Sequence, residues 1–152
     1  MQPLFPAAAE GGTMRILRTV AAALLMTAML AACATLALPE RRNQLVGDVQ
    51  DFTQRLRWKD INGAADYFEK QPGEAFREMF ADTQDLHIVD VKVERVDMPQ
   101  PELATVNFSY QYYELPSITV RRESVEQEWV LHPRGKGLPG EWKIASEFPE
   151  RR

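Results

Sequence analysis

Five side chains in the second half of the chain have the chemistry to bind a ligand. They are the phenols of Tyr110 and Tyr112, the guanidinium of Arg122, the amide of Gln127 and the indole of Trp129. Each shares the alternating positions of nearby apolar residues, so each is a candidate to point inward. A buried guanidinium is costly unless it is paired, so a bend that turns Arg122 to solvent is the favoured alternative. For the tyrosines, the favoured alternative is a core position with a satisfied hydroxyl.

The sequence carries no recognisable catalytic or metal-binding motif. His87 and His132 are the only histidines and have no metal-ligand spacing. Neither a Gly-x-Ser-x-Gly segment nor a glycine-rich phosphate loop after a strand occurs. A general base would need to face the interior, whereas these strand acids have the opposite parity: Asp90, Glu94, Glu126 and Glu128. We therefore predict no catalytic residue, no metal and no cofactor.

Helices that position these side chains are predicted in residues 43–81. Apolar residues spaced by four, three and four share one face of the first helix: Leu45, Val49, Phe52 and Leu56. Asn43 is its predicted N-cap, and Asp60 is the N-cap of a second helix at 61–70. Residues 71–73, with Pro72 at their centre, are predicted to interrupt the helix before a third segment at 74–81.

From residue 86 the apolar period changes from about 3.6 to 2, which indicates β-strands. In the third strand, Ile118 and Val120 have one parity and Trp129 has the other, which predicts a β-bulge. The predicted inward set is Val89, Val91, Val93, Val106, Phe108, Tyr110, Tyr112, Val120, Val125, Trp129 and Leu131. We expect an α+β domain over 43–146, with N-terminal helices on a bent four-stranded antiparallel sheet. Residues 147–152 are expected to be a polar tail.

Several segments resemble the nuclear transport factor 2-like superfamily of cone-shaped α+β domains. They are Arg57-Trp58-Lys59-Asp60, Ala64-Ala65-Asp66-Tyr67-Phe68, the bent third strand and Gly140-Glu141-Trp142-Lys143-Ile144. The resemblance covers about residues 43–146 and implies a pocket between the concave sheet face and the helices. Its members include isomerases, dehydratases and partner-binding adaptors, so the fold does not fix the function. A cystatin-like sheet wrapped on one long helix is the rival architecture.

The N-terminal region has the layout of a secretory signal peptide. Arg15 and Arg18 precede an uncharged run that ends in Leu30-Ala31-Ala32-Cys33. These residues resemble a bacterial lipobox, which implies cleavage before Cys33, a diacylglyceryl group on its thiol and acylation of its amino group. We interpret 1–13 as a start-site error, 14–32 as the signal peptide and 33–42 as the acylated cysteine and tether. The alternatives are a membrane span over 19–38 and a buried structural cysteine.

The resemblance also implies a location. An aspartate after the acylated cysteine retains Gram-negative lipoproteins at the inner membrane, and this chain has Ala34 there. We therefore expect the periplasmic face of the outer membrane, or the outer side of the cytoplasmic membrane in a Gram-positive source. The whole chain carries −4 and residues 1–32 carry +1, so the mature chain carries −5. This balance argues against binding nucleic acid.

These observations predict an anchored, non-catalytic periplasmic lipoprotein that binds a protein partner or a small apolar ligand. The alternative is a small isomerase or dehydratase that uses Tyr112 and Arg122 in the cone pocket. A purely structural envelope role is a third hypothesis. A monomer is expected because polar side chains fill the outer sheet face: Thr105, Asn107, Ser109, Gln111, Thr119, Arg121, Glu126 and Glu128.

Overall fold

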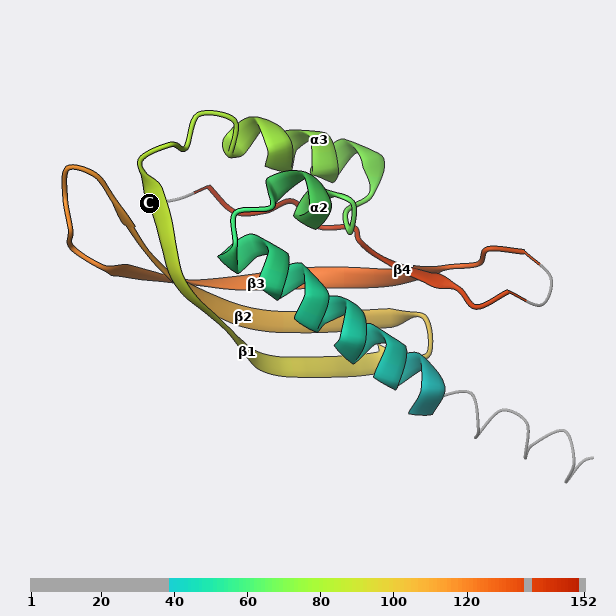
Figure 1. Ribbon diagram of the computed structural model, residues 1–152. Helices are drawn as coiled ribbons and strands as arrows, with labels where there is room; N and C mark the ends of the chain where they lie inside the picture. Colours follow the sequence, from blue (N-terminus) through green and yellow to red (C-terminus); the bar gives the residue numbers. More distant parts are fainter. Residues whose placement is uncertain (1–38, 136–137, 151–152) are drawn as a thin grey trace, which may run out of the picture. The chain divides into compact units, whose positions relative to one another are not determined.

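The computed structural model describes residues 39–135 and 138–150. The predictions for the signal peptide and Cys33 lie outside these residues. Residues 41–152 form one compact unit. Its first helix, which includes residues 41–57, precedes α2 (Ile61–Ala65), α3 (Lys70–Met79), β1 (Leu86–Gln100), β2 (Leu103–Glu114), β3 (Arg121–His132) and β4 (Glu141–Ile144) (Figure 1).

The first helix buries the predicted apolar stripe. Its four residues are all at most 1% exposed: Leu45, Val49, Phe52 and Leu56. The predicted start at Asn43 is wrong, because residues 39–42 are already helical. The last four residues of the predicted tether are therefore helical too. Glu40, Arg41 and Arg42 are strong helix formers, and Arg41 also pairs with Glu102 at 3.7 Å.

The two short helices differ from the prediction at their shared boundary. Asp60 caps α2 as expected, accepting a hydrogen bond from the Gly63 backbone N–H at 3.0 Å. The helix ends at Ala65 because the following residues pair with β4, where Phe68 forms a bridge to Ile144. The predicted interruption at 71–73 is wrong, since α3 begins at Lys70. Pro72 lies in its first turn, where a missing backbone N–H removes no helical bond.

The four strands form an antiparallel meander in the order β1-β2-β3-β4, as the sequence predicts. The predicted bulge in the third strand is wrong: β3 pairs with β2 without interruption from residue 121. Ile118 and Val120 precede the strand, so their parity carries no information about it. The register shifts lie in β1 instead. One of them leaves Val89 without a partner residue on β2, and its predicted inward side chain is exposed.

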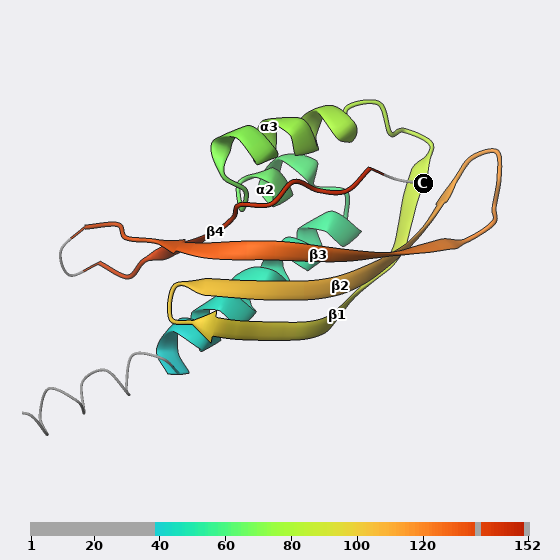
Figure 2. The ribbon, with the colours of Figure 1, turned by 180° about the vertical axis from the view of Figure 1, so that it is seen from behind.

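The helices cover one face of the sheet, which establishes an α+β architecture (Figures 1 and 2). Phe52 of the first helix is the centre of the core, with edge-to-face contacts to Phe68, Phe108 and Trp129 at 5.8–6.0 Å. Such contacts add to the free energy gained by burying the rings. The inner face of the sheet is therefore packed against helices rather than open to solvent.

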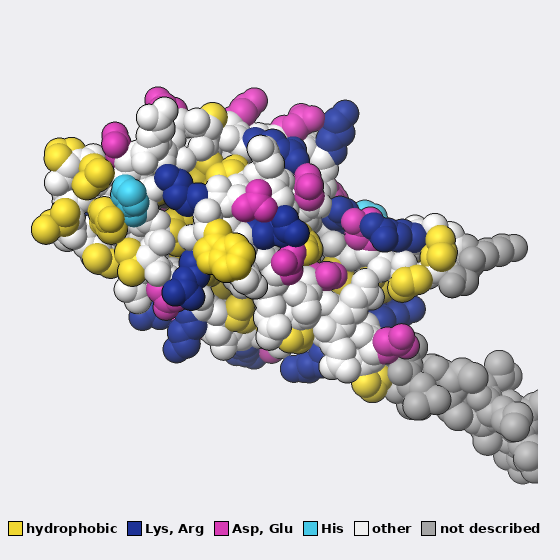
Figure 3. Space-filling model, viewed as in Figure 1, with side chains coloured by type: hydrophobic (Ala, Val, Ile, Leu, Met, Phe, Trp, Pro, Cys, Tyr) yellow, Lys and Arg dark blue, Asp and Glu magenta, His cyan; other side chains and the backbone are white. Residues whose placement is uncertain are grey.

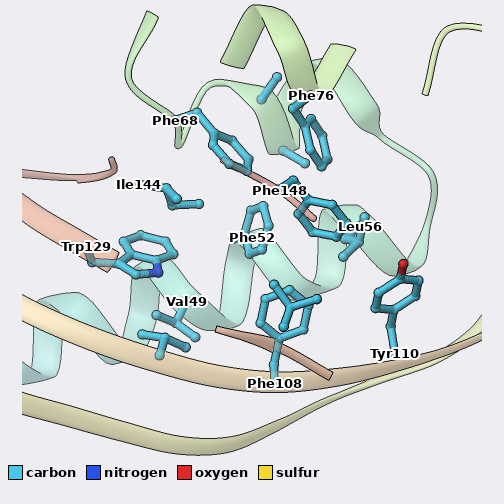
Figure 4. Close-up of a cluster of buried hydrophobic side chains, with 14 of the residues drawn as sticks. Val49, Phe52, Leu56, Phe68, Phe76, Phe108, Tyr110, Trp129, Ile144 and Phe148 are labelled. Atoms are coloured by element: carbon cyan, nitrogen blue, oxygen red, sulfur yellow. The ribbon is translucent and has the colours of Figure 1, made fainter. Parts of the chain in front are cut away.

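The segment after β4 also belongs to the core. Phe148 is only 4% exposed and lies between Phe76 of α3 and Phe108 of β2 (Figure 4). Its ring centroid is 5.2 Å from that of Phe76 and 5.9 Å from that of Tyr110. The prediction of a polar tail from residue 147 is therefore wrong at Phe148. A single aromatic residue among charged ones gives no periodic signal, so sequence patterning missed it.

Candidate functional site

Four of the five predicted ligand-binding residues lie together on the inner face of the sheet. Tyr110, Tyr112, Gln127 and Trp129 are buried there, which confirms their inward orientation. Arg122 lies on the opposite face, and its side chain is 54% exposed. It donates to Glu94 Oε1 at 2.6 Å and to Ser109 Oγ at 2.9 Å. The structure therefore does not assemble the five predicted residues into one site.

The four inward residues are packed by other side chains. The Trp129 ring contacts Phe52 and Tyr67, with centroids 6.0 and 6.1 Å apart. Gln127 Oε1 accepts a hydrogen bond from Trp129 Nε1 at 3.3 Å, whereas Gln127 Nε2 has no hydrogen-bond partner in the described part of the chain. These side chains are at most 1% exposed, so they fill the concave face rather than line an opening. Their role is that of a core, which was the favoured alternative for the tyrosines.

A carboxylate that sequence reasoning missed lies beside the two tyrosines. The hydroxyls of Tyr110 and Tyr112 donate to the two oxygens of Glu123 at 3.1 and 2.9 Å. Burial raises the pKa of Tyr112, and the hydrogen bond to Glu123 raises it further. Glu123 has the same parity as Val125, and counting back from that residue would have found it. The predicted bulge hid this signal, because it reversed the expected direction of every earlier side chain.

A polar hollow of about 310 Å³ lies where the first helix, α2 and β4 meet. Its lining includes charged groups of both signs and two aromatic residues. The lining residues are Gln44, Asp48, Arg55, Gly63, Asp66, Tyr67, Arg134, Gly140, Glu141, Trp142 and Lys143. Several titratable groups with shifted pKa values gather here, which is a common property of functional sites.

One side of the hollow is held by a hydrogen-bonded network around Asp51. Tyr67 donates its hydroxyl to Asp51 Oδ2 at 2.5 Å, and Arg55 Nε donates to the same oxygen at 2.6 Å. These bonds lower the pKa of Asp51, with that from Tyr67 the larger cause. Burial, followed by the bond to Asp51, raises the pKa of Tyr67 to about 12. At neutral pH the carboxylate is ionised and the phenol protonated, so neither is poised for proton transfer.

Asp48 lies about one turn before Asp51 on the same helix and also lines the hollow. Its pKa is raised mainly by burial and then by the charges of Glu141 and Asp51. Asp48 makes no hydrogen bond or ion pair with any described residue. Trp142 nearby is 1% exposed, and its indole N–H has no hydrogen-bond partner in the described part of the chain. The hollow thus holds one unpaired acceptor and one unpaired donor, neither of which the sequence singled out.

An exposed group of apolar side chains forms a second feature, which we call the apolar tip. It consists of Leu115, Ile118 and Val120 in the connection between β2 and β3, with exposures of 44%, 80% and 52%. Hydrophobic side chains gather at the end of the molecule where this connection protrudes (Figures 1 and 3). The prediction that Val120 points inward is therefore wrong. Its strand begins only at Arg121, so nothing directs Val120 towards the core.

Comparison with known proteins does not add an assignment. No protein-family model matches the sequence, and no curated protein matches it either. Within residues 39–135 and 138–150, no group of three or more His, Cys, Asp or Glu side chains is placed to hold a metal ion. None of the helices described is both long enough and apolar enough to cross a membrane.

Proposed function

We propose that this chain is a lipid-anchored protein of the bacterial envelope that acts as a non-catalytic binding module. In this proposal Cys33 carries the lipid, and the apolar tip docks a protein partner. The observation that carries it is the exposure of three large apolar side chains in one connection. Covering each of them with a partner contributes up to about 1.5–3 kcal/mol to binding. An exposed apolar patch of this kind is typical of an interaction surface.

The arrangement of the folded unit supports a partner over insertion of the tip into the anchoring membrane. The residue-41 end of the first helix and the apolar tip lie at opposite ends of this unit (Figures 1 and 2). Only five residues lie between Cys33 and Pro39, so the six steps from one to the other span about 20 Å of extended chain at most. A lipid on Cys33 therefore keeps the domain near the bilayer at the end remote from the tip. The tip is then available to a protein on the other side.

The packing of the inner face favours one of the two predicted kinds of ligand. Helices on one face of an antiparallel sheet support assignment to the nuclear transport factor 2-like cone. Its pocket would be the place for a small apolar ligand, but Tyr110, Gln127 and Trp129 are packed there. The isomerase alternative depended on Tyr112 and Arg122, which lie on opposite faces of the sheet. These observations favour a protein partner at the surface.

The proposed location rests on the sequence of the leader. Ala34 favours the periplasmic face of the outer membrane in a Gram-negative source, and the outer side of the cytoplasmic membrane is the Gram-positive equivalent. The outer sheet face is polar, with the exposed Arg122–Glu94 pair at 2.6 Å, and this supports a monomer. Cys33→Ser should move the protein from the membrane to the soluble fraction. Intact-mass analysis of the native protein should show the acylated Cys33 at the N-terminus.

Site-specific photo-crosslinking in cells that produce the protein tests the role of the tip. A photoreactive residue replaces Ile118 in the anchored protein, and a matched protein carries it at Leu138. Leu138 is 63% exposed in the β3–β4 connection, so it reports contacts of an exposed apolar residue outside the tip. We expect a discrete protein adduct at Ile118 that is absent at Leu138. Identical adducts at both positions, or none at Ile118, would contradict the proposal.

A further inference from the structure

Most polar side chains around the hollow are already committed to partners within the fold. Arg55 bonds to Asp51 at 2.6 Å and to Asp60 at 2.9 Å. Arg134 and Lys143 both pair with Glu141 at 2.7 Å. Each of the three cations that line the hollow therefore contacts a carboxylate, and Arg134 and Lys143 share that of Glu141. An anionic ligand would have to compete with these ion pairs.

The remaining polar groups follow the same pattern. Asp66 pairs with Arg77 at 2.8 Å, and Gln44 Nε2 donates to the backbone oxygen of Gly140 at 2.7 Å. Tyr67 donates its hydroxyl to the network around Asp51. Two lining groups stand apart: the Asp48 carboxylate and the Trp142 indole N–H have no partner among the described residues. A buried donor without a partner is unfavourable and is normally satisfied by water or a ligand.

We propose that this hollow binds a small primary amine that also carries hydroxyl groups, with the ammonium on Asp48 and a hydroxyl oxygen on the Trp142 N–H. Asp48 is the only charged side chain of the lining that makes no ion pair with a described residue, so a cation is the group that can pair there. The unpaired indole requires an acceptor, and an ammonium alone supplies none. The volume of about 310 Å³ is at the lower end of the range for small-molecule sites, so it suits a ligand the size of an amino alcohol or amino sugar.

This site is separate from the tip. None of its lining residues belongs to the β2–β3 connection, so either proposal can fail without the other. The hollow is formed within one folded unit by the first helix, by α2 and the segment after it, and by β4 and the connection before it. A ligand there would therefore join the helical layer to the edge of the sheet. Binding should slow the opening of β4, which is measurable by hydrogen exchange of its amides.

The test is NMR of the indole N–H signals in the full chain carrying Cys33→Ser. The chain has three tryptophans, and the signal that Trp142→Phe removes is that of Trp142. The probes are ethanolamine and glucosamine, with ethylene glycol and glucose as neutral counterparts. We expect both amines to shift the Trp142 signal saturably and the neutral compounds to bind at least tenfold more weakly. The Trp58 signal, from a residue that is 71% exposed and outside the hollow, should not move.

Two matched variants complete the experiment. Asp48→Asn keeps the shape of the side chain, removes its charge and should weaken amine binding at least tenfold. Asp97→Asn makes the same change in β1, outside the hollow, and should leave binding unchanged. An unmoved Trp129 signal shows that each variant is folded. No Trp142 shift with either amine, equal shifts with the neutral compounds, or unchanged affinity in Asp48→Asn would each overturn the proposal.

Discussion

The hydroxyl of Tyr67 donates to the Asp51 carboxylate at 2.5 Å, across 16 residues of sequence. This bond ties the segment after α2 to the polar side of the first helix. Arg55, one turn beyond Asp51, donates to the same oxygen and also reaches Asp60. A charged hydrogen bond of this kind is stronger than a neutral one and fixes the orientation of both elements. The wall of the hollow is therefore held by side chains rather than by backbone pairing alone.

Tyr67→Phe should lower the free energy of unfolding by about 1–2 kcal/mol, because it removes one hydrogen bond to an ionised group. Urea unfolding followed by circular dichroism measures the change. Tyr113→Phe is the matched control, since its hydroxyl has no hydrogen bond with the described residues. We expect that control to stay within about 0.5 kcal/mol of the parent. Equal losses in the two variants would show that the bond does not stabilise the fold.

The same bond predicts an acid-dependent loss of stability. The pKa of folded Asp51 lies below its ordinary value of 3.8, so the folded state binds fewer protons than the unfolded state. The stabilisation is complete above pH 3.8 and is lost as the pH falls through the folded-state pKa. Asp51→Asn should flatten this part of the curve of stability against pH. Unfolding midpoints between pH 2 and 6 test this, and an unchanged slope would contradict it.

Asp48 and Glu141 line the same hollow but should respond oppositely to loss of charge. Burial raises the pKa of Asp48, so its ionised form destabilises the fold at neutral pH, and this cost disappears as the pH falls through that raised pKa. Asp48→Asn should therefore raise the free energy of unfolding at pH 7 by up to about 1 kcal/mol. Lys143 and Arg134 lower the pKa of Glu141, so Glu141→Gln should decrease stability by less than about 1 kcal/mol. Changes of the same sign would refute this contrast.

Amine binding should also depend on pH through Asp48. The groups that act on it are Glu141 and Asp51, which raise its pKa, and Lys143 and Arg134, which lower it. Because burial dominates, Asp48 takes up a proton above its ordinary value of 3.8. Ethanolamine affinity should fall as the pH is lowered through that raised pKa. Titrations from pH 7 to 4 measure this, and an affinity that is constant over the range would contradict it.

Phe148→Ala should lower the free energy of unfolding by about 3–5 kcal/mol, the usual cost of removing a buried phenylalanine. Glu147→Ala changes the exposed neighbouring residue and should have almost no effect. Guanidinium unfolding of both variants measures the difference. A loss below about 1 kcal/mol for Phe148→Ala would show that the segment after β4 does not complete the core.

Ile118→Glu should separate binding from folding at the tip. The side chain is 80% exposed, so the free energy of unfolding should change by less than about 0.5 kcal/mol. Binding would bury the introduced carboxylate in the partner interface, which is costly. The variant should therefore no longer compete with the parent protein for photo-crosslinking to the partner. Leu138→Glu is the matched control and should still compete. Equal competition by the two variants would remove the tip from the interface.

Local periodicity predicted the parts of the fold that repeat. The helical stripe from Leu45 to Leu56 and the alternation from Val106 to Tyr112 both correspond to buried faces. Bulges and helix breaks, which interrupt the periodic pattern, were harder to locate from the sequence. Val89 becomes the extra residue of a bulge through its pairing with β2, which is a long-range relationship. Pro72 suggested a break, but its place in the first turn depends on where α3 begins.

The candidate sites depend on contacts that no pattern encodes. Glu123 is opposite Tyr110 only because β2 and β3 pair in one register. Asp48 and Trp142 are 94 residues apart, and they meet around one hollow because β4 lies beside the helical layer. Their significance also comes from what they lack, namely partners within the fold. The lack of a partner can be recognised only in the folded structure, once the ion pairs of the neighbouring residues are known.

The position of Phe148 has a consequence for how the chain acquires its structure. Synthesis proceeds from the N-terminus, so Phe76, Phe108 and Tyr110 emerge well before the ring that they pack against. The core is complete only after Phe148 has left the ribosome. Under the export proposed above this delay is useful, because a polypeptide that has not yet closed its core can still be threaded through a membrane channel.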